Sequence, residues 1–385
     1  MIVPMAAMAE TNGPASRCRI LANGFRDAGV EVVTCMAEDV NYKAMDGITN
    51  YFLDIPMPMG LPECIAKRTF PVAQKLGITS KKTVDSFDQV LRFTGNLDYK
   101  YLKKSVASVR KAIQESNADC VYSEFNISAI IAAKKEGIPL CATVSYPTQH
   151  EYAHRSDLAH GLNHLLEELQ LPKVESALQL FDLADKAFCP SIPELEPIKK
   201  ENIIYCGSLK KIRNDEDPDR KRDKIVVYMG NGTIHAEEMI KVTKNAFQGI
   251  AYEVYIASSY LKEETLGNIH VAPRWQFDTL LKEAVLFIDH GGQNSMVDGL
   301  LYGVPQIMVP GKIFERKYNA KCVADHRAGI VLDHRQFTEE YLRKTADDIL
   351  SSDEMANNAA LLGRKLLEAG GMETILRSVV DSFIR

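Results

Sequence analysis

Several features that would direct the interpretation of a 385-residue chain are missing from this sequence. No apolar run approaches the ~18 residues that a membrane-spanning helix needs, so we expect no transmembrane segment. Basic residues do not dominate: the net charge is −5 and the pI is about 6.0, which argues against nucleic acid as the main partner. The eight cysteines form no CxxC pair. We therefore expect reduced, buried thiols and a cytoplasmic protein.

What the chain does contain is the composition of a globular protein, with 46% apolar and 25% charged residues. The N-terminal segment MIVPMAAMAE lacks a basic n-region, so we interpret it as a first strand and loop rather than a signal peptide. Short apolar runs alternate with helical patterns through both halves of the chain. This alternation predicts α/β domains of the doubly wound type.

The stretch from Val285 to Val309 predicts a strand, a glycine turn, a helix and a second strand in succession. The apolar run Val285–Ile288 is typical of a strand buried on both faces of a parallel sheet. Gly291-Gly292 allows a tight turn, and Asn294 or Ser295 is expected to cap the following helix. Backbone N–H groups at such a turn, with the positive end of a helix dipole behind them, bind a diphosphate or a carboxylate.

Two further side chains favour a ligand at this turn. His290 is placed at the carboxyl end of the strand, where open α/β sheets bind their ligands. Asp298 lies one turn inside the helix, where it could accept hydrogen bonds from a ribose diol. The alternative is a strand–helix turn that glycine merely tightens, with no ligand. The polar residues around the glycine pair favour the first interpretation.

The segment HGGQNSMVDGLLYGVPQIMVPGKIFERKYNA, residues 290–320, resembles the nucleotide-sugar signature of the UDP-glycosyltransferases. This family includes the macrolide and other natural-product glycosyltransferases and the glucuronosyltransferases. Its pattern runs HGG-x-NS, an acidic residue, GVP, P, DQ and NA. The matching residues are His290, Gly291, Gly292, Asn294, Ser295, Asp298, Gly303, Val304, Pro305, Pro310, Glu315, Arg316, Asn319 and Ala320, with the DQ pair matched only in position.

The resemblance implies a GT-B fold, in which two Rossmann-like doubly wound domains face a cleft. Residues 1–206 would form the N-terminal acceptor-binding domain and residues 225–368 the nucleotide-sugar-binding domain. Residues 207–224 would form a linker, and KKIRNDEDPDRKRDK (210–224) has almost no apolar content. Residues 369–385 would form a C-terminal helix that crosses back to the N-terminal domain.

The same resemblance implies a set of donor-binding residues. They are Gly232, Thr233, Arg274, Trp275, Phe277, His290, Gly291, Gly292, Gln293, Asn294, Ser295, Asp298, Glu315 and Arg316. Arg274 or Trp275 could stack on a uracil or thymine ring, with a core tryptophan as the alternative. Glu315 and Arg316 replace an Asp-Gln pair that holds the donor sugar. Arg316 could bind a carboxylated sugar or a phosphate oxygen, or pair with Glu315 and do neither.

The catalytic base is where the sequence departs from the family. Relatives carry a histidine directly after a glycine in the first loop, which here ends Asn12-Gly13-Pro14, ahead of a helix predicted over Ala15–Ala28. Proline offers no base. Glu124 matches an acid that orients this histidine, and it could itself act as the base or bind the acceptor. Glu10 is a second candidate, although a solvated surface carboxylate is the favoured interpretation there. His150 is a third.

Four histidines lie within fifteen residues, at positions 150, 154, 160 and 164. The spacing of four within each pair is compatible with metal ligands on a helix. No HExxH motif is present and the resembling family needs no metal, so a polar helix is the favoured interpretation and no metal is predicted. His150 or His154 could instead supply the missing base.

Taken together, these features predict an inverting, metal-independent hexosyltransferase. It would move a sugar from a nucleoside diphosphate sugar of the UDP or TDP type to a small-molecule acceptor, such as a natural product or another secondary metabolite. No cofactor besides the donor is expected, and a homodimer is left open. The alternatives are a sugar-nucleotide epimerase of related fold and a non-catalytic nucleotide-sugar-binding protein. The sequence does not specify the donor or the acceptor further.

Overall fold

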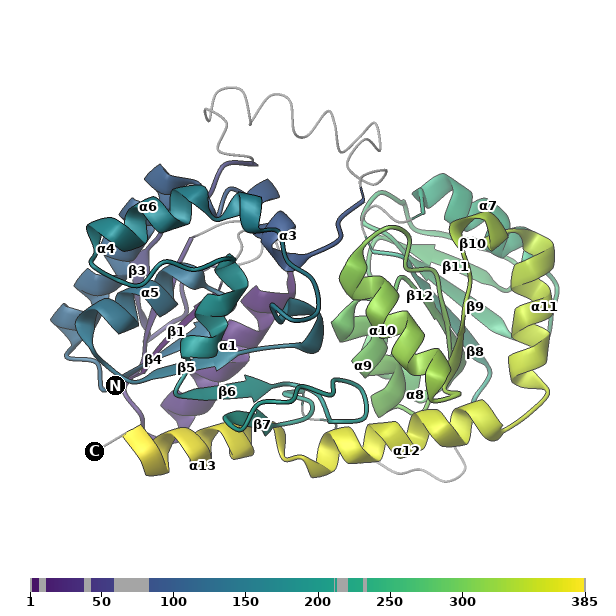
Figure 1. Cartoon of the computed structure of the whole chain (residues 1–385). Helices are drawn as coiled ribbons and strands as arrows, with labels where there is room; N and C mark the ends of the chain where they lie inside the picture. The colour runs from purple at the N-terminus through teal and green to yellow at the C-terminus, as the bar shows by residue number, and fades with distance from the viewer. Residues whose placement is uncertain are drawn as a thin grey trace. The chain divides into compact units, whose positions relative to one another are not determined.

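The computed structural model describes residues 2–6, 12–37, 43–58, 83–210, 212, 221–230 and 234–383. The chain divides into two compact units. Unit 1 comprises Met1–Pro71, Asp85–Lys210 and Ala369–Arg385, and unit 2 comprises Val72–Val84 and Lys211–Glu368. Each unit contains a seven-stranded sheet with helices packed against it (Figure 1). No described helix has the length and apolar character to cross a membrane.

The sheet of unit 1 is parallel, in the order β3-β2-β1-β4-β5-β6-β7. Its strands are β1 (Ile2–Ala6), β2 (Val33–Met36), β3 (Thr49–Phe52), β4 (Cys120–Glu124), β5 (Leu140–Thr143), β6 (Lys186–Cys189) and β7 (Ile203–Tyr205). Its helices are α1 (Asn12–Asp27), α3 (Phe87–Phe93), α4 (Tyr99–Ser116), α5 (Ile127–Glu136), α6 (His160–Glu168) and α13 (Gly371–Phe383), with 3₁₀ turns η3 (Tyr146–Thr148), η4 (Ser156–Leu158) and η5 (Ala177–Leu183).

The ends of the unit 1 helices follow from local chemistry. Asp98 begins α4, because its side chain accepts a hydrogen bond from the Tyr101 N–H, and Asn126 caps α5 in the same way through the Ala129 N–H. Gly137 ends α5 in the left-handed conformation, which glycine adopts without steric cost.

One face of the unit 1 sheet is covered by two helices from opposite ends of the chain. Phe25 of α1 and Ile375 of α13 belong to one buried cluster with Tyr122 of β4. The Lys186 ammonium on β6 also donates hydrogen bonds to the backbone and hydroxyl oxygens of Ser378. The C-terminal helix is therefore an integral part of unit 1. The described cysteines are free thiols, and those in the core are buried as predicted: Cys18, Cys35, Cys120, Cys141, Cys189 and Cys206.

The sheet of unit 2 runs in the order β10-β11-β9-β8-β12-β13-β14, parallel except for the antiparallel edge strand β10. Its strands are β8 (Lys224–Tyr228), β9 (Glu253–Ala257), β10 (Glu264–Leu266), β11 (Ile269–Ala272), β12 (Ala284–Asp289), β13 (Gln306–Met308) and β14 (Gly329–Val331). Its helices are α7 (Ala236–Phe247), α8 (Phe277–Lys282), α9 (Gln293–Leu301), α10 (Phe314–Asp325), α11 (Glu339–Leu350) and α12 (Glu354–Glu368), with the 3₁₀ turn η6 (His334–Gln336).

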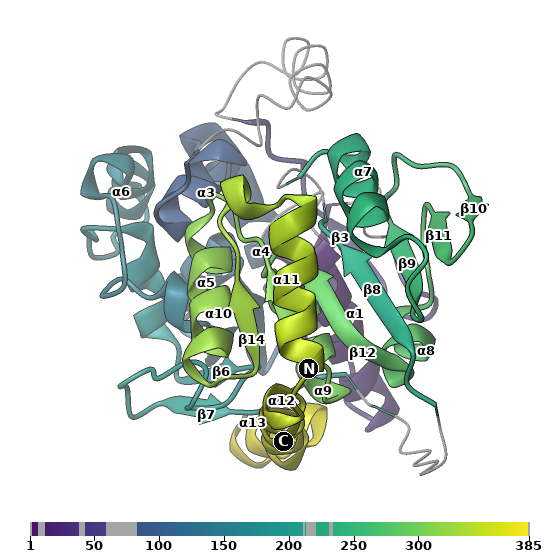
Figure 2. The same cartoon turned by 90° about the vertical axis from the view of Figure 1, so that its right-hand side faces the viewer.

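Both faces of this sheet are buried, as the apolar runs predicted. Val227 and Ile288 point to the face that α7 and α11 cover, and these two helices pack together beside the sheet (Figure 2). Val226 and Phe287 belong to the cluster on the other face, with residues of α8. Alternating side chains of β8 and β12 thus fill two separate cores, which fixes the register of the central strands.

Each sheet reverses its winding direction once. In unit 1 the chain proceeds from β1 to β2 on one side and later to β4 on the other, so the switch point lies between β1 and β4. In unit 2 it lies between β8 and β12. Open α/β sheets bind ligands outside the carboxyl ends of the strands at this point. The predicted doubly wound α/β architecture is confirmed.

Two local predictions are wrong. Helix α1 begins at Asn12, so Asn12, Gly13 and Pro14 lie in its first turn and not in a loop. Proline is tolerated there, because the first-turn N–H groups have no intrahelical partner to lose. The helix suggested by the 150/154 spacing is also absent, since the chain forms the 3₁₀ turn Tyr146–Thr148 and then a turn through His150.

The contact between α9 and α12 gives a test of the unit 2 packing. A Cβ added at Gly363 of α12 would lie 2.1 Å from the carbonyl oxygen of Leu300, which is backbone and cannot rotate away. We expect Gly363→Ala to lower the free energy of unfolding by about 1–3 kcal/mol, since the helices must separate. Urea unfolding of the full chain measures this loss. Leu361→Ala, on the exposed side of the same helix, is the control. Equal stability of both variants would contradict this packing.

Candidate active site

The turn between β12 and α9 lies at the switch point of unit 2. Gly292 is the N-cap of α9, and no side chain caps the helix there. The first intrahelical bond runs from the Met296 N–H to the Gly292 carbonyl. The prediction that Asn294 or Ser295 caps the helix is therefore wrong, because both residues lie within its first turn. The N–H groups of that turn have no intrahelical acceptor, and the positive end of the helix dipole lies behind them.

Both glycines of this turn are required by close contacts. Gly291 has φ +74°, and a Cβ there would lie 2.8 Å from the carbonyl oxygen of Arg316. A Cβ at Gly292 would lie 2.6 Å from Nε2 of His290. The backbone therefore passes directly against the imidazole ring and against the first turn of α10. Asn319 fixes this arrangement by donating a hydrogen bond to the Gly291 carbonyl over 2.9 Å.

Two ionisable side chains are buried in the turn. Asp289 is fully buried and His290 is 8% exposed. The Gly291 N–H donates to Asp289 Oδ1 over 2.6 Å. Among the residues that the structure describes, Asp289 Oδ2 and His290 Nδ1 have no hydrogen-bond partner. Buried polar atoms are rarely left in this state, so the turn has the character of a site that a polar ligand completes.

The electrostatics of the turn follow from this burial. Burial raises the pKa of Asp289 to about 7, against the smaller opposing effects of the Gly291 N–H and the Arg316 charge. Burial, assisted by Arg316, lowers the pKa of His290 to about 3, against the smaller opposing effect of a hydrogen bond to the Tyr228 backbone. The imidazole is therefore neutral at physiological pH. A neutral imidazole can donate from one nitrogen and accept at the other.

Arg316 lies in the first turn of α10, next to the glycine turn. Burial lowers the pKa of its guanidinium, while Glu315, Tyr228 and Asp289 raise it. The sequence left open whether Arg316 reaches a phosphate, reaches a sugar or only pairs with Glu315. Its electrostatic coupling to Asp289 and His290 places its charge at the glycine turn. Glu315, in the same helical turn, is half-buried.

Aromatic rings surround the same corner of the sheet. The Tyr228 ring lies at the end of β8. Its centroid is 5.6 Å from that of the His290 ring, which it meets edge-on, and 5.2 Å from that of the Phe277 ring. Trp275 is half-buried, and its indole N–H donates to the Ile256 carbonyl over 3.0 Å. The tryptophan is thus held by β9. The neighbouring Arg274 is exposed.

The remaining predicted donor-binding residues lie at or near this corner, with two exceptions. Gln293, Asn294 and Ser295 form the first turn of α9, and Asp298 is half-buried one turn later. Gly232 and Thr233 fall outside the described residues. They follow Gly230, where an added Cβ would lie 3.0 Å from the His290 ring.

In unit 1, Glu124 ends strand β4 at the switch point and is fully buried. Its Oε1 accepts a hydrogen bond from Arg17 Nε over 2.5 Å, and the Thr143 hydroxyl donates to Oε2. Burial raises the pKa of this carboxyl group, and the Arg17 charge and the Thr143 bond oppose the rise. The next residue, Phe125, has φ +57°, which is a strained backbone conformation. Its ring lies 5.5 Å from the Arg17 guanidinium.

This ion pair joins α1 to the end of β4, where the sequence resemblance led us to expect a histidine–acid pair. Arg17 is on α1, three residues after Pro14, so it is on the same side of the helix as the buried proline. The sequence analysis did not identify Arg17 as a partner of Glu124. Its position three residues after Pro14, on one side of a helix, was a signal that could have done so. Glu10 lies outside the described residues. His150 lies in the turn after η3, with Nε2 at 3.7 Å from Glu175 Oε2.

Comparisons with known proteins show what this chain is similar to. Residues 256–370 match the family model described as Erythromycin biosynthesis protein CIII-like, C-terminal domain. The curated relative named Uncharacterized UDP-glucosyltransferase YdhE, from Bacillus subtilis (strain 168), is 24% identical over 180 residues, or 45% of this chain and 45% of that protein. The match thus spans less than half of that relative's length.

Two solved structures resemble nearly the whole chain. The glycotransferase of kitacinnamycin has a TM-score of 0.74 at 16% identity, covering 99% of this chain and 98% of that one. The glycosyltransferase VinC in complex with DTDP has a TM-score of 0.71 at 15% identity, covering 99% of each chain. The fold is GT-B, so the predicted fold class is confirmed. The resemblance of the 290–320 segment to the UDP-glycosyltransferases is confirmed as well.

The opposite pKa shifts of Asp289 and His290 predict a pH dependence that single substitutions reveal. Asp289 titrates near 3.8 when unfolded and about 7 when folded, so its contribution to stability is lost as pH rises through that window. His290 titrates near 6.5 unfolded and about 3 folded, so its contribution is lost as pH falls. Each shift corresponds to roughly 4–5 kcal/mol, and the two oppose each other between about pH 4 and 6.5.

We therefore expect Asp289→Asn to gain stability as pH rises from about 4 to 6.5, and His290→Gln to lose it over the same range. Urea unfolding at a series of pH values measures both slopes. The exposed His334→Gln variant should keep the wild-type profile. Slopes of equal sign in the two variants would contradict the burial of these groups.

Proposed function

We propose that the protein is an inverting glycosyltransferase. It transfers a sugar from a nucleoside diphosphate sugar, bound by unit 2, to a small-molecule acceptor, bound by unit 1. The observation that carries this proposal is the buried turn from Asp289 to Gly292. It combines an uncapped helix start, a neutral imidazole with an unpartnered Nδ1 among the described residues, and an adjacent guanidinium.

Each part of the turn has a role in this reaction. The first-turn N–H groups of α9 bind diphosphate oxygens, and Arg316 supplies a permanent positive charge beside them. As the glycosidic bond to the diphosphate breaks, negative charge develops on the leaving oxygens. Pre-oriented donors in a buried site stabilise that charge without reorganising. His290 can donate to the diphosphate or to a donor sugar hydroxyl through a ring nitrogen.

The donor nucleotide is proposed to be a uridine or thymidine diphosphate. The name of the Bacillus relative refers to UDP-glucose chemistry, and VinC was solved with DTDP. Trp275 is held at the end of β9 by its bond to the Ile256 carbonyl, and either it or the neighbouring Arg274 is proposed to stack on a pyrimidine. Asp298 is proposed to bind the ribose diol and Glu315 the donor sugar. A natural product or another secondary metabolite is the proposed acceptor, because the matching family model is named after an erythromycin biosynthesis protein.

The acceptor must lose a proton as it attacks. Glu124 is fully buried with both carboxylate oxygens engaged, so we assign it to positioning Arg17 rather than to proton transfer. Glu10 and His150 remain as candidate bases. An acidic acceptor, such as a phenol or a carboxylic acid, needs little help from either. We propose no metal or other cofactor for the transfer step. A cytoplasmic location stays a prediction, and a homodimer stays open.

Pro14 and the Arg17–Glu124 ion pair also support a second candidate, a non-catalytic nucleotide-sugar-binding protein. In this version unit 2 binds the donor as proposed, but unit 1 has no base. It predicts the same affinity for nucleotides and no glycoside product. A sugar-nucleotide epimerase would instead consume the donor with no acceptor.

Binding of nucleotides tests the assignment of the glycine turn. We expect UDP or dTDP to bind the wild-type chain, and about 100 times the Kd should stabilise it by ~2.7 kcal/mol. Arg316→Gln should weaken diphosphate binding about tenfold to a hundredfold, because a charge-assisted hydrogen bond contributes about 1.5–3 kcal/mol. It should leave uridine or thymidine binding unchanged. Calorimetry with each nucleoside and its diphosphate measures this difference, with His334→Gln as control.

The combined Asn294→Ala, Ser295→Ala variant is expected to abolish the thermal shift that the diphosphate produces. Wild-type affinity for diphosphates in both this variant and Arg316→Gln would show that the nucleotide binds elsewhere.

Turnover separates the proposed transferase from its alternatives. With UDP- or dTDP-sugars and a panel of phenols and carboxylic acids, we expect one nucleoside diphosphate released per glycoside formed, with inverted anomeric configuration. Mass spectrometry and NMR of the product measure both. Donor consumed without any acceptor would indicate an epimerase. Tight donor binding with no product from the whole panel would favour the non-catalytic protein.

A further inference from the structure

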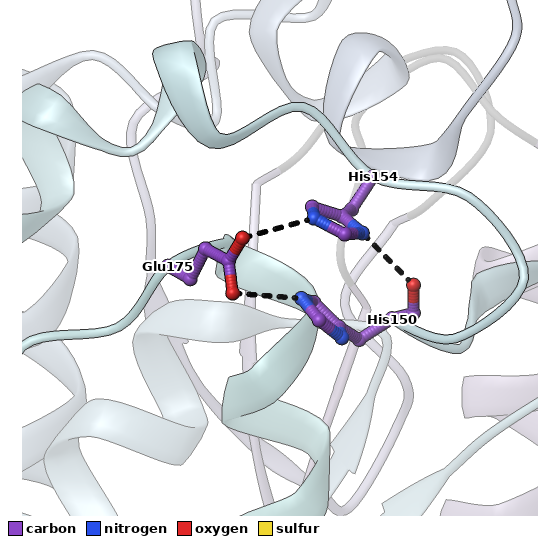
Figure 3. A group of neighbouring side chains, drawn as sticks. All are labelled: His150, His154 and Glu175. Atoms are coloured by element: carbon purple, nitrogen blue, oxygen red, sulfur yellow. Dashed lines mark hydrogen bonds and ion pairs between the residues drawn. The ribbon is translucent and has the colours of Figure 1, made fainter.

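Three potential metal ligands from two segments of unit 1 converge outside the site described above (Figure 3). His150 lies in the turn after η3, His154 in the loop that follows, and Glu175 just before η5. The ligand atoms of the three side chains all lie within 4.8 Å of one another. Both histidine side chains are partly buried, at 18% and 31% exposure, whereas Glu175 is 56% exposed. The cluster is therefore accessible from solvent through its carboxylate side.

The hydrogen bonds of His154 determine which of its nitrogens is available. Its Nδ1 lies 3.1 Å from the backbone carbonyl of His150, an oxygen that can only accept, so Nδ1 carries a proton. In the neutral ring, Nε2 then holds the lone pair. This nitrogen lies 3.3 Å from Glu175 Oε1. A nitrogen lone pair and a carboxylate oxygen repel each other at this distance. A proton or a metal ion between them removes the repulsion.

His150 adds a third acceptor to the same place. Its Nε2 lies 3.7 Å from Glu175 Oε2, too far for a hydrogen bond, and has no hydrogen-bond partner among the described residues. The two imidazole rings stack with centroids 3.9 Å apart and 19° between their planes. Both Nε2 atoms thus face the one carboxylate (Figure 3).

The backbone around the three side chains is fixed by buried polar groups. Asp88 Oδ2 accepts hydrogen bonds from the Arg155 N–H over 2.5 Å and from the Ser176 hydroxyl over 3.2 Å. One buried carboxylate therefore holds the residue after His154 and the residue after Glu175. Asn163 holds the residue before Glu175, because its side-chain amide exchanges two hydrogen bonds with the Val174 backbone. Outer groups that fix the ligand-bearing backbone are typical of metal sites.

We propose that His150, His154 and Glu175 form a binding site for a divalent transition metal ion, with Zn²⁺ as the ion best matched. Two imidazole nitrogens and one carboxylate oxygen are ligands of Zn²⁺, and solvent fills the fourth position. The donor set does not suit Mg²⁺ or Ca²⁺, which require more oxygen ligands. Zn–N and Zn–O bonds of about 2.0–2.2 Å require the side chains to close slightly around the ion. The exposed Glu175 side chain has the freedom to do so.

The metal ion would connect the 150–154 turn to the segment that carries Glu175, and so stabilise the loops at the carboxyl side of β5. It would also occupy the His150 lone pair. His150 is then a metal ligand and not the base of the transfer reaction, which leaves Glu10 as the candidate base. The site does not depend on the proposed nucleotide chemistry, since no residue of unit 2 contributes to it.

The test is a Zn²⁺ titration of the full-length chain, freed of metal by a chelator and then exchanged into buffer. We expect wild-type protein to bind one Zn²⁺ per chain by calorimetry and elemental analysis, and to unfold at a higher temperature with Zn²⁺ but not with Mg²⁺. His154→Gln and Glu175→Gln should each weaken binding at least tenfold. Co²⁺ should give the intense visible absorption of a tetrahedral site in the wild-type chain and not in His154→Gln or Glu175→Gln.

His164→Gln is the matched control, because His164 also lies near a carboxylate, 3.9 Å from Glu168, on the exposed surface of α6. It should bind Zn²⁺ as the wild-type chain does. The proposal is overturned if wild-type protein binds no stoichiometric Zn²⁺. It is equally overturned if His154→Gln and Glu175→Gln bind as tightly as the control, which would leave only a proton between the imidazole and the carboxylate.

Discussion

The close approach of the chain to the His290 ring is the constraint on which the rest of unit 2 depends. A side chain at position 292 would collide with this ring, and one at 291 would collide with the backbone of α10. The turn at positions 291 and 292 therefore consists of backbone without side chains. Bare peptide at the start of a helix, next to a buried imidazole and a guanidinium, is a surface of hydrogen-bond donors with few competing acceptors. The two cores on either side of β12 hold that surface rigid.

The two switch points use the same topology in opposite ways. At the unit 2 switch point, Asp289 and His290 keep unpartnered polar atoms among the described residues. At the unit 1 switch point, Glu124 has Arg17 on one oxygen and Thr143 on the other. The first arrangement leaves hydrogen-bonding capacity for a ligand, and the second consumes it internally. Because of this contrast, we propose donor binding at the unit 2 turn and assign no base to the unit 1 switch point.

The features that could be predicted from the sequence are those that residues close together in the chain determine. Apolar runs and glycine positions indicated the strands, the doubly wound order and the turn at 290–292, because each of these is specified within a short segment. The contacts that give the sites their character join distant segments, and no local pattern contains them. Arg17 meets Glu124 across 107 positions, and His154 meets Glu175 across 21. The predicted starts of two helices were also wrong. Pro14 lies in the first turn of α1 and Gly292 is the N-cap of α9, whereas residue preferences had placed Pro14 in a loop and the cap at Asn294 or Ser295.

The charges at the unit 2 turn are consistent with an anionic ligand. Below about pH 7, Asp289 is protonated and His290 is neutral, so Arg316 is the charge that faces the glycine turn from these three residues. A diphosphate bound there, as proposed, would meet the Arg316 charge without an opposing charge on Asp289. If Asp289 were ionised, its carboxylate would neutralise Arg316 and repel the phosphate oxygens. An anionic ligand at this turn and the proton on Asp289 would therefore stabilise each other, because two negative charges in one buried volume repel. Burial of Asp289, which costs stability near neutral pH, is thus the feature that keeps a carboxylate charge away from the Arg316 guanidinium at lower pH.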